Sequence, residues 1–252
     1  MAQSSRINPI GCGCLVLLLG PVLFNVLSQS IVPLFFAAVL VGIGLIVFLI
    51  LRANKVQRTL DVFIQNAGEK AKVVVFDTET TGLYPEDGDR VVQIAFILLD
   101  ENLEYVTDFS TLFNPSRDVG RTDIHGITQG MVKTAPRFNS MAGKFAKVLE
   151  GKVLVAHNSD FDMRFLESEF FQSPVAAPQV LKVIDTLALA RQHVRGSKNF
   201  KLMSLVEHLQ IDTSNAPYGR AHDARFDAWC CAEILKRILD DAGIERRKIT
   251  GA

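Results

Sequence analysis

The stretch "VVVFDTETTGL", Val73 to Leu83, decides the fold, because a run of apolar residues ends in two acids. Val-Val-Val-Phe is typical of a buried strand, and Asp77 and Glu79 follow it two residues apart. Side chains at positions i and i+2 of a strand point to the same face, so the carboxylates converge if the strand continues through Glu79. Two neighbouring carboxylates repel each other, so they resist being ionised together, and a bound divalent cation removes this repulsion. The alternative is a strand end with two solvated acids.

From residue 72 onward, apolar runs and helical spacings follow one another along the chain. Strands paired by a hairpin, then strands alternating with helices, predict an α/β domain with a mixed sheet and helices packed on it. Asp185 is expected to cap a helix, and 196–200, "GSKNF", is expected to be a mobile loop. The expected strands cover 72–77, 90–99, 104–113, 153–156 and 180–184, and the expected helices cover 138–149, 160–171, 185–193, 202–209 and 224–239.

A second polar group lies in "VLVAHNSDFDMRFL", residues 153–166. A short strand ends at His157 and Asn158, and Asp162 falls in the first turn of the helix that follows. Taken alone, Asp162 could simply complement the helix dipole, and Asn158 could simply close the turn.

A third polar group lies in "YGRAHDARFDAWCCAEIL", residues 218–235. His222 and Asp227 are five residues apart, about 140° around a helix, so they would not share one face. They converge if His222 lies in the loop before the helix and Asp227 in its early turns, with Asp223 at the helix start. The alternative is a surface histidine near a capping acid.

Together the three segments contain D-x-E, N-x-x-x-D and H-x-x-x-x-D, each at the end of a strand or helix. This ordered set resembles the DnaQ-like, or DEDD, 3′→5′ exonucleases, in the branch whose last motif carries a histidine. The resemblance covers about residues 72–240 and implies an RNase H-like fold with a mixed five-stranded sheet flanked by helices. The matching stretches are "FDTETTGL" (76–83), "HNSDFDMRFL" (157–166), "HDARFDA" (222–228) and "IHGIT" (124–128), the last similar to a substrate-side loop of that family.

The resemblance implies a site with two divalent metal ions, Mg²⁺ or Mn²⁺, since such hard ions prefer oxygen ligands. It makes His222 the general base that takes a proton from the attacking water, and histidine side chains titrate in the range that this task needs. The implied product is a nucleoside 5′-monophosphate. The implied metal ligands are Asp77, Glu79, Asp162 and Asp227, and the implied substrate contacts are Thr80, Leu83, Ile124, His125 and Asn158.

The expected partner is nucleic acid, namely single-stranded DNA 3′ ends, because "TETTGL" and "IHGIT" look most like the polymerase proofreading subunits of the family. One alternative is an exoribonuclease of the RNase T or oligoribonuclease type. The other is a catalytically silent, membrane-tethered module that binds nucleic acid. A dedicated replicative proofreader is disfavoured, because we find no clear clamp-binding or polymerase-binding motif.

The N-terminal part of the chain predicts a membrane anchor over residues 1–52. Two uncharged segments, 10–28 and 31–51, predict a transmembrane helical hairpin, and the second spans about 31 Å if helical. Basic residues flank the hairpin at Arg6 and at Arg52, Lys55 and Arg58, so the positive-inside rule places both ends in the cytoplasm. A cleaved signal peptide is the alternative, but the apolar region is too long.

These observations give the expected organisation of the chain. The protein is expected in the cell inner membrane with its catalytic domain in the cytoplasm. After residue 69 the chain holds 23 basic and 25 acidic residues. This part therefore lacks the basic excess of a protein that coats nucleic acid non-specifically. The anchor, 1–52, is followed by a juxtamembrane helical linker at 53–70, an exonuclease domain at 71–242 and a tail at 243–252.

Overall fold

The computed structural model describes residues 33–51, 58, 61–65, 70–214, 216 and 221–250. The chain divides into two compact units, Met1–Arg52 and Ala53–Ala252. In the first unit, helix Pro33–Leu51 has 19 residues and a mean hydropathy of 3.1, so its length and composition would allow it to cross a membrane. Among the described residues it is the one helix with this property. The expected first span, 10–28, lies outside the described residues.

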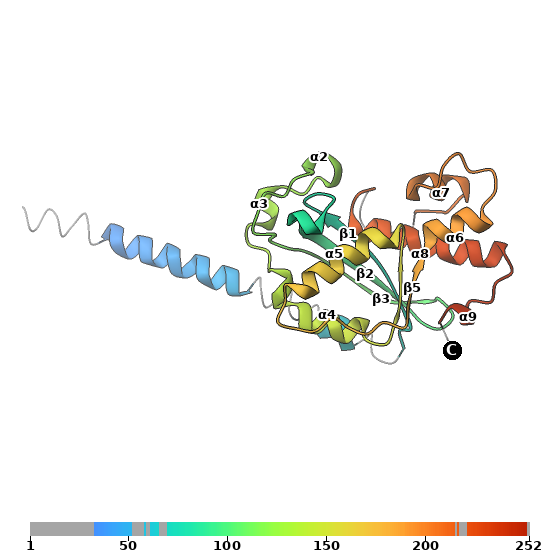
Figure 1. The fold of residues 1–252 in the computed structure, drawn as a ribbon. Helices are drawn as coiled ribbons and strands as arrows, with labels where there is room; N and C mark the ends of the chain where they lie inside the picture. Colours follow the sequence, from blue (N-terminus) through green and yellow to red (C-terminus); the bar gives the residue numbers. More distant parts are fainter. Residues whose placement is uncertain are drawn as a thin grey trace, which may run out of the picture. The chain divides into compact units, whose positions relative to one another are not determined.

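The second unit is built on a five-stranded sheet with the strand order β3-β2-β1-β4-β5 (Figure 1). The central strand β1 is antiparallel to β2 and parallel to β4, so the predicted mixed sheet is confirmed. The strands are β1 (Val73–Thr80), β2 (Val91–Leu99), β3 (Tyr105–Leu112), β4 (Val153–Ala156) and β5 (Lys182–Asp185).

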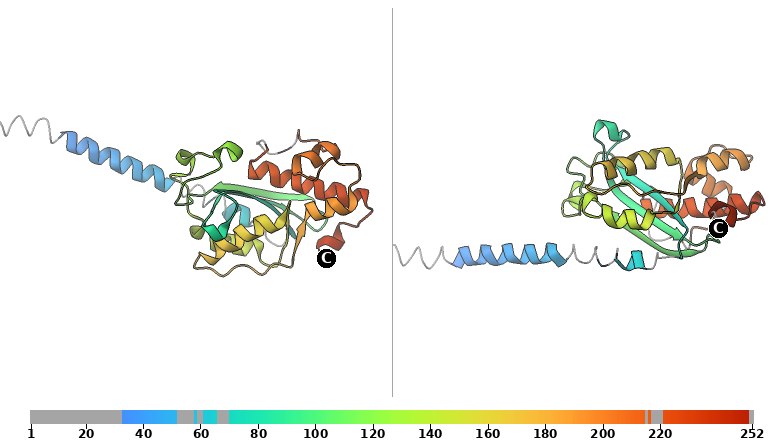
Figure 2. Two further views of the ribbon diagram at one scale, coloured as in Figure 1. Left: turned by 45° about the horizontal axis from the view of Figure 1, so that its top comes forward. Right: turned by 60° about the horizontal axis from the view of Figure 1, so that its bottom comes forward.

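Both faces of the sheet are covered, which explains why the β1 sequence is apolar at successive positions (Figures 1 and 2). Val73 and Val75 pack in one cluster with residues of α8 (Ala224–Asp241). Val74 and Phe76 pack in the opposite cluster, which holds residues of α4 (Ala142–Leu149) and α5 (Ser159–Phe171). Odd-numbered β1 residues therefore face α8, and even-numbered ones face α4 and α5.

Several short elements differ from the expectation. The expected helix at 138–149 is a 3₁₀ turn followed by α4, because Phe138, Met141 and Phe145 are buried in either geometry and their spacing does not separate the two. Ile249 is buried in the α8-side cluster, so part of the expected tail packs on the domain. The remaining elements are η1 (Pro85–Asp87), α2 (Thr122–His125), α3 (Gln129–Val132), η2 (Phe138–Ser140), α6 (Thr186–His193), α7 (Leu202–His208) and α9 (Arg247–Thr250).

The packed core includes a residue that lies before the expected domain boundary. Phe63, in the helical segment 61–65, is 2% exposed. Its ring centroid lies 6.3 Å from that of Phe96 and 5.4 Å from that of Phe109. Part of the expected linker is therefore attached to the sheet by aromatic packing.

A buried ion pair joins α5 to the start of β2. The Nε and Nη2 of Arg90 donate to the two carboxylate oxygens of Glu169 at 2.8 and 2.7 Å. The Val91 N–H donates to the same carboxylate at 3.1 Å, and Glu169 is 2% exposed. A two-point guanidinium–carboxylate contact fixes orientation as well as distance. It therefore sets the position of α5, and with it the position of Asp162, relative to the sheet.

Candidate active site

The first two acids lie at the end of the central strand. β1 continues through Thr80, with an irregularity in its pairing with β2 between Glu79 and Thr80. Asp77 and Glu79 are odd-numbered, so they belong to the face of the sheet that packs against α8. Glu79 is 8% exposed, and Asp77 has intermediate exposure. The condition for their convergence, a strand that persists through Glu79, is met.

Asp162 reaches the same strand from α5. β1 is paired with β4 only as far as Val75, so the later backbone groups on that edge need other partners. The Oδ1 of Asp162 accepts hydrogen bonds from the Thr78 N–H at 2.9 Å and from the Thr78 hydroxyl at 2.6 Å. Asp162 is 3% exposed. Thr78, between the two acids of β1, thus holds the third acid, a role that sequence reasoning missed.

The third segment converges through the loop before α8. The Asp223 side chain caps α8 by accepting from the Arg225 N–H, and His222 precedes it with a φ of 66°. The His222 backbone N–H donates to Oδ2 of Asp227, which lies in the first turn of α8, at 2.9 Å. The expected loop position of His222 is therefore observed, and the turn brings it next to Asp227.

A glutamine of β2 holds the start of α8 against the sheet. Gln93 is the cross-strand partner of Glu79, and its Oε1 accepts from the Ala224 N–H at 3.2 Å. Gln93 is 9% exposed. Nothing in the sequence motif indicates this contact, because it joins residues that are 131 positions apart.

These elements bring the acids together. One ligand atom each from Glu79, His222 and Asp227 lies within 4.8 Å of the others. Burial, together with repulsion from Asp162, Asp227 and Glu79, raises the pKa of Asp77 well above its usual value. Burial and the neighbouring carboxylates raise the pKa of Glu79 to about 8. Burial also raises the pKa of Asp162 to about 7 and that of Asp227 to about 6.

The donor set fits divalent cations. Among the described residues, the buried Oδ1 of Asp227 has no hydrogen-bond partner, while Oδ2 is held by the backbone. A buried carboxylate oxygen without a partner is costly, and a cation would satisfy it. A bound cation would also offset the repulsion that raises the pKa values of the acids. Glu79, His222 and Asp227 are the described residues whose ligand atoms lie close enough together to hold one cation.

The metal-free protein is expected to lose stability as the pH rises from about 5 to about 8. Glu79, Asp162 and Asp227 have raised folded-state pKa values, whereas carboxyls of an unfolded chain titrate near 4. The folded state therefore holds more protons in this window, and the stabilisation that those protons provide is lost as the pH passes the folded pKa values. Melting temperatures of the full chain in EDTA and in Mg²⁺ measure this effect.

Mg²⁺ should restore the melting temperature most strongly at the alkaline end of that range. The variant Asp77→Asn, which removes one of the repelling charges, should melt above the wild type in EDTA at alkaline pH. A melting temperature in EDTA that increases with pH would contradict the assignment of these pKa values.

The expected substrate residues Leu83 and Ile124 are both exposed, and the segments that precede them approach each other closely. Their exposed fractions are 51% and 37%, high for large apolar side chains. Gly120 lets the two loops approach: its φ is 69°, and a Cβ there would lie 1.9 Å from the Thr81 carbonyl oxygen. Thr80 is buried, and its hydroxyl donates to the Gly82 carbonyl at 2.6 Å, so that side chain shapes the turn.

The other two expected contacts lie at the end of α2 and before α5. His125 is buried, and its Nδ1 accepts from the Ile127 N–H at 2.9 Å. In the neutral ring the proton therefore lies on Nε2, which has no partner among the described residues. Burial lowers the pKa of His125, which favours that neutral form. Asn158 is exposed before α5 with a φ of 68°, and its N–H donates to Asp185 at 2.9 Å.

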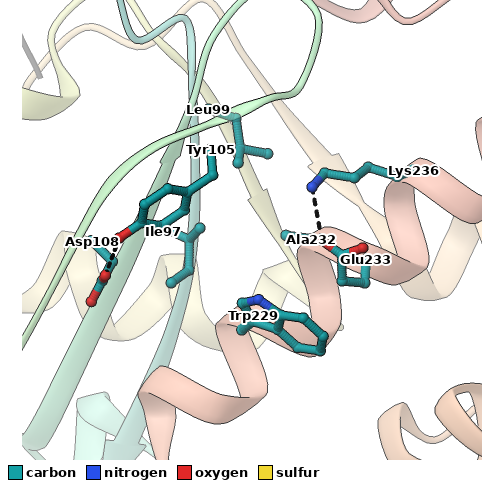
Figure 3. A pocket seen from close by; sticks show the side chains of 8 residues that line it. All are labelled: Ile97, Leu99, Tyr105, Asp108, Trp229, Ala232, Glu233 and Lys236. Carbon is teal, nitrogen blue, oxygen red and sulfur yellow. Dashed lines mark hydrogen bonds and ion pairs between the residues drawn. The ribbon is translucent and has the colours of Figure 1, made fainter. Parts of the chain in front are cut away.

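A cavity outside the acidic cluster lies between α8 and the β2-β3 hairpin (Figure 3). Its volume is about 240 Å³, and Trp229 and Tyr105 lie on opposite sides of it. The Tyr105 hydroxyl donates to Asp108, and Lys236 pairs with Glu233 at 2.7 Å. Asp108 also forms an ion pair with Arg225. Because each charged side chain that lines this cavity already has a partner, we assign the cavity no part in the site.

Comparisons with known proteins identify the family. A family model described as Exonuclease, that of RNase T, matches residues 74–235. The DNA polymerase III subunit epsilon of Rickettsia conorii is 32% identical over 171 residues, which cover 66% of this chain and 73% of that protein. The chain therefore belongs to the exonuclease family, and the matched region is a 3′–5′ exonuclease domain with the histidine-type DEDD motifs. A DNA polymerase III subunit epsilon-like protein of Rhodobacter capsulatus is 37% identical over 180 residues, 68% of this chain, and the chain spans about a quarter (24%) of that relative.

Solved structures show the same fold. The nuclease domain of 3′hExo, a DEDDh family member bound to rAMP, aligns with a TM-score of 0.58 at 21% identity, covering 71% of this chain and 96% of that one. Escherichia coli Exonuclease I in complex with a dT13 oligonucleotide aligns with a TM-score of 0.54 at 19% identity, covering 67% and 40%. The expected RNase H-like fold is thus confirmed.

Proposed function

We propose that this protein is a metal-dependent exonuclease that removes nucleoside 5′-monophosphates from the 3′ ends of single-stranded DNA. One observation carries the proposal: Glu79, His222 and Asp227 converge within 4.8 Å at the end of the central strand. Asp77 and Asp162 lie close to this cluster. Besides burial, Asp162 raises the pKa values of Asp77 and Glu79, and Asp227 and Glu79 raise that of Asp77. Four acids that repel one another and a neighbouring histidine can supply the metal ligands and the general base of two-metal phosphodiester hydrolysis.

Two divalent cations held by the four carboxylates would stabilise the charge that develops on the phosphate and lower the pKa of a water molecule. The chain's own groups have other tasks. His222 is exposed at the edge of the cluster and accepts the proton of the attacking water at its imidazole. The strand β1 holds Asp77 and Glu79, and Thr78 orients Asp162. Leu83 and Ile124 offer apolar surface to the terminal base.

DNA is the favoured substrate, because two stretches of the chain resemble polymerase proofreading subunits and a relative carries the name DNA polymerase III subunit epsilon. RNA is the second candidate, because the 3′hExo nuclease domain, which shares the fold, was solved with rAMP. The two substrates differ at the 2′-hydroxyl, which a site must accept or exclude.

We propose that the helix Pro33–Leu51 anchors the protein in the cell inner membrane and that 10–28 adds a second span. Arg52, Lys55 and Arg58 follow the helix, so the positive-inside rule places the catalytic domain in the cytoplasm. Alkaline carbonate extraction of membranes tests the anchor, and protease treatment of spheroplasts tests the orientation. Release of the full chain by carbonate would reject the membrane anchor. Digestion of the catalytic domain by protease added to spheroplasts would reject the cytoplasmic orientation.

The substrate experiment uses the full chain in detergent with Mg²⁺ on matched DNA and RNA, single- and double-stranded, labelled at the 3′ end. The expected result is release of labelled mononucleotide first, fastest from single-stranded DNA, and none in EDTA. Asp77→Asn serves as the inactive control. A wild-type chain that binds these strands without metal-dependent release would instead support the silent nucleic-acid-binding module.

A further inference from the structure

A groove opens beside His222, between α6 and the segment that leads into α7. Its volume is about 760 Å³, and His222 and Asn158 are among the residues that line it. His222 also belongs to the acidic cluster, so the groove and the active site share a wall. The other lining side chains include Arg191, Lys198, Phe200 and Lys201.

Three cations line this groove, and no acid does. Arg191, Lys198 and Lys201 are all exposed, and none of them has an ion-pair partner among the described residues. Among the other exposed cations of the domain, Arg237 is paired with Asp241, whereas Lys147 has no ion pair among the described residues. Three unpaired positive charges in one groove repel each other, and an anionic ligand removes that repulsion.

The segment that carries two of these cations is held in place. His157 accepts from or donates to the Thr186 hydroxyl through Nδ1 at 2.9 Å, and its Nε2 lies 2.9 Å from the Phe200 carbonyl oxygen. Because a carbonyl only accepts, Nε2 carries a proton in this contact. The Lys201 N–H donates to the Asn199 side chain at 2.9 Å. The expected mobile loop at 196–200 is thus attached to the end of β4 through Phe200.

The groove is lined by other elements than those that carry the proposed terminal-base contacts. Leu83 and Ile124 are carried by the β1-β2 loop and α2, whereas the groove lies at α6 and α7. α2 and α7 lie at the same end of the sheet and apart from each other (Figure 1). A strand whose terminal nucleotide contacts the α2 side would continue past His222 into the groove.

We propose that this groove binds the phosphodiester backbone of the substrate strand on the 5′ side of the scissile bond, through Arg191, Lys198 and Lys201. The proposal rests on the proposed exonuclease function. The active site is acidic and takes metal ions, while the groove is basic and takes the next phosphates directly. This division would let a domain without a basic excess bind a nucleic acid, because three cations and no acid line the groove.

The test compares a long and a short substrate on the full chain in detergent. A thymidine oligonucleotide reaches the groove, whereas the 4-nitrophenyl ester of thymidine 5′-monophosphate has one phosphodiester and does not. In Lys198→Ala/Lys201→Ala, the ratio of kcat/KM for the oligonucleotide to that for the ester should decrease roughly tenfold. The plot of log KM against log salt should become shallower by about 1.4, which is two lost phosphate contacts on a single strand.

Two further variants separate local contact from general charge. Lys147→Ala/Lys248→Ala removes the same charge from exposed positions on α4 and α9, and it should keep the wild-type ratio and salt slope. Lys198→Arg/Lys201→Arg should retain both. If the wild type and Lys198→Ala/Lys201→Ala have the same kcat/KM ratio and the same salt slope, the proposal that this groove binds the substrate strand is wrong.

Binding without hydrolysis distinguishes this proposal from the proposed function. The affinity of a fluorescent oligonucleotide, measured by anisotropy in EDTA, should weaken in Lys198→Ala/Lys201→Ala and not in Lys147→Ala/Lys248→Ala. A wild type that hydrolyses neither substrate but shows this difference would reject the exonuclease function and retain the groove. Equal binding in all variants would reject the groove whatever the catalytic result.

Discussion

Replacing Asp77 or Asp227 by alanine is expected to abolish release of mononucleotides, a loss of roughly a thousandfold or more, or about 4 kcal/mol of transition-state stabilisation. Asp77 lies within the central strand β1, and burial together with four neighbouring carboxylates raises its pKa. Asp227 has one oxygen held by the His222 backbone and another that is buried without a partner among the described residues. Removal of either acid leaves too few oxygen ligands in place for the metal ions.

The fold should survive these substitutions, because each removes a charge that its neighbours repel. Melting in EDTA at alkaline pH should therefore be unchanged or higher for Asp77→Ala. Asp160→Ala is the matched control: Asp160 is an exposed acid in the first turn of α5, two positions from Asp162, and its loss should leave activity near the wild-type value. Metal-dependent activity of Asp77→Ala at the wild-type level would refute the assignment of the ligands.

Replacing His222 is expected to lower kcat by roughly 10²- to 10⁴-fold, the usual contribution of a general base. The contact to Asp227 is made by the His222 backbone N–H, so a substitution keeps it while it removes the imidazole. The backbone at His222 has a φ of 66°, a conformation that asparagine tolerates better than alanine does. His222→Asn therefore removes the base with the least strain, and His222→Ala tests the same role with some loss of stability.

Rate against pH and metal affinity together decide the role of His222. His222→Asn should change the dependence of the rate on pH at saturating Mg²⁺, because it removes the imidazole that accepts the proton. The concentration of Mg²⁺ that gives half of the maximal rate should change little. An unchanged pH profile would show that another group accepts the proton, and a large increase in the Mg²⁺ requirement would show that His222 binds metal.

The strands and the acids could be predicted from the sequence because their signals are local. The apolar run before Asp77 predicts a buried strand, and β1 extends a little further, to Thr80. β4 has the expected bounds, and α8 begins at Ala224 as expected. The order of three short motifs, each at an element end, was enough to group their acids without any contact information.

The groups that hold those acids in place could not be predicted. The Thr78–Asp162 contact joins residues 84 positions apart, and Gln93 reaches α8 across 131. Such contacts depend on which strands are neighbours and on where their pairing ends, and neither is a property of a local pattern. Gly120 was missed for the same reason, since only the close approach of Thr81 requires a glycine there. α2 and α3, at four residues each, are too short for a hydrophobic period to emerge.

Because β1 lies in the middle of the sheet and His222 lies in a turn, the two parts of the active site should differ in how easily they open. Asp77 and Glu79 belong to the part of β1 that pairs with β2, in a strand with packed clusters on both faces. Their amide protons should therefore exchange with solvent only when the whole domain opens. His222 lies in an exposed turn before α8, so its amide should exchange through small local openings. The acids on β1 would then keep their positions while the turn that carries His222 opens and closes. On warming, proton transfer to His222 should therefore weaken at a lower temperature than the one at which the acids lose their arrangement.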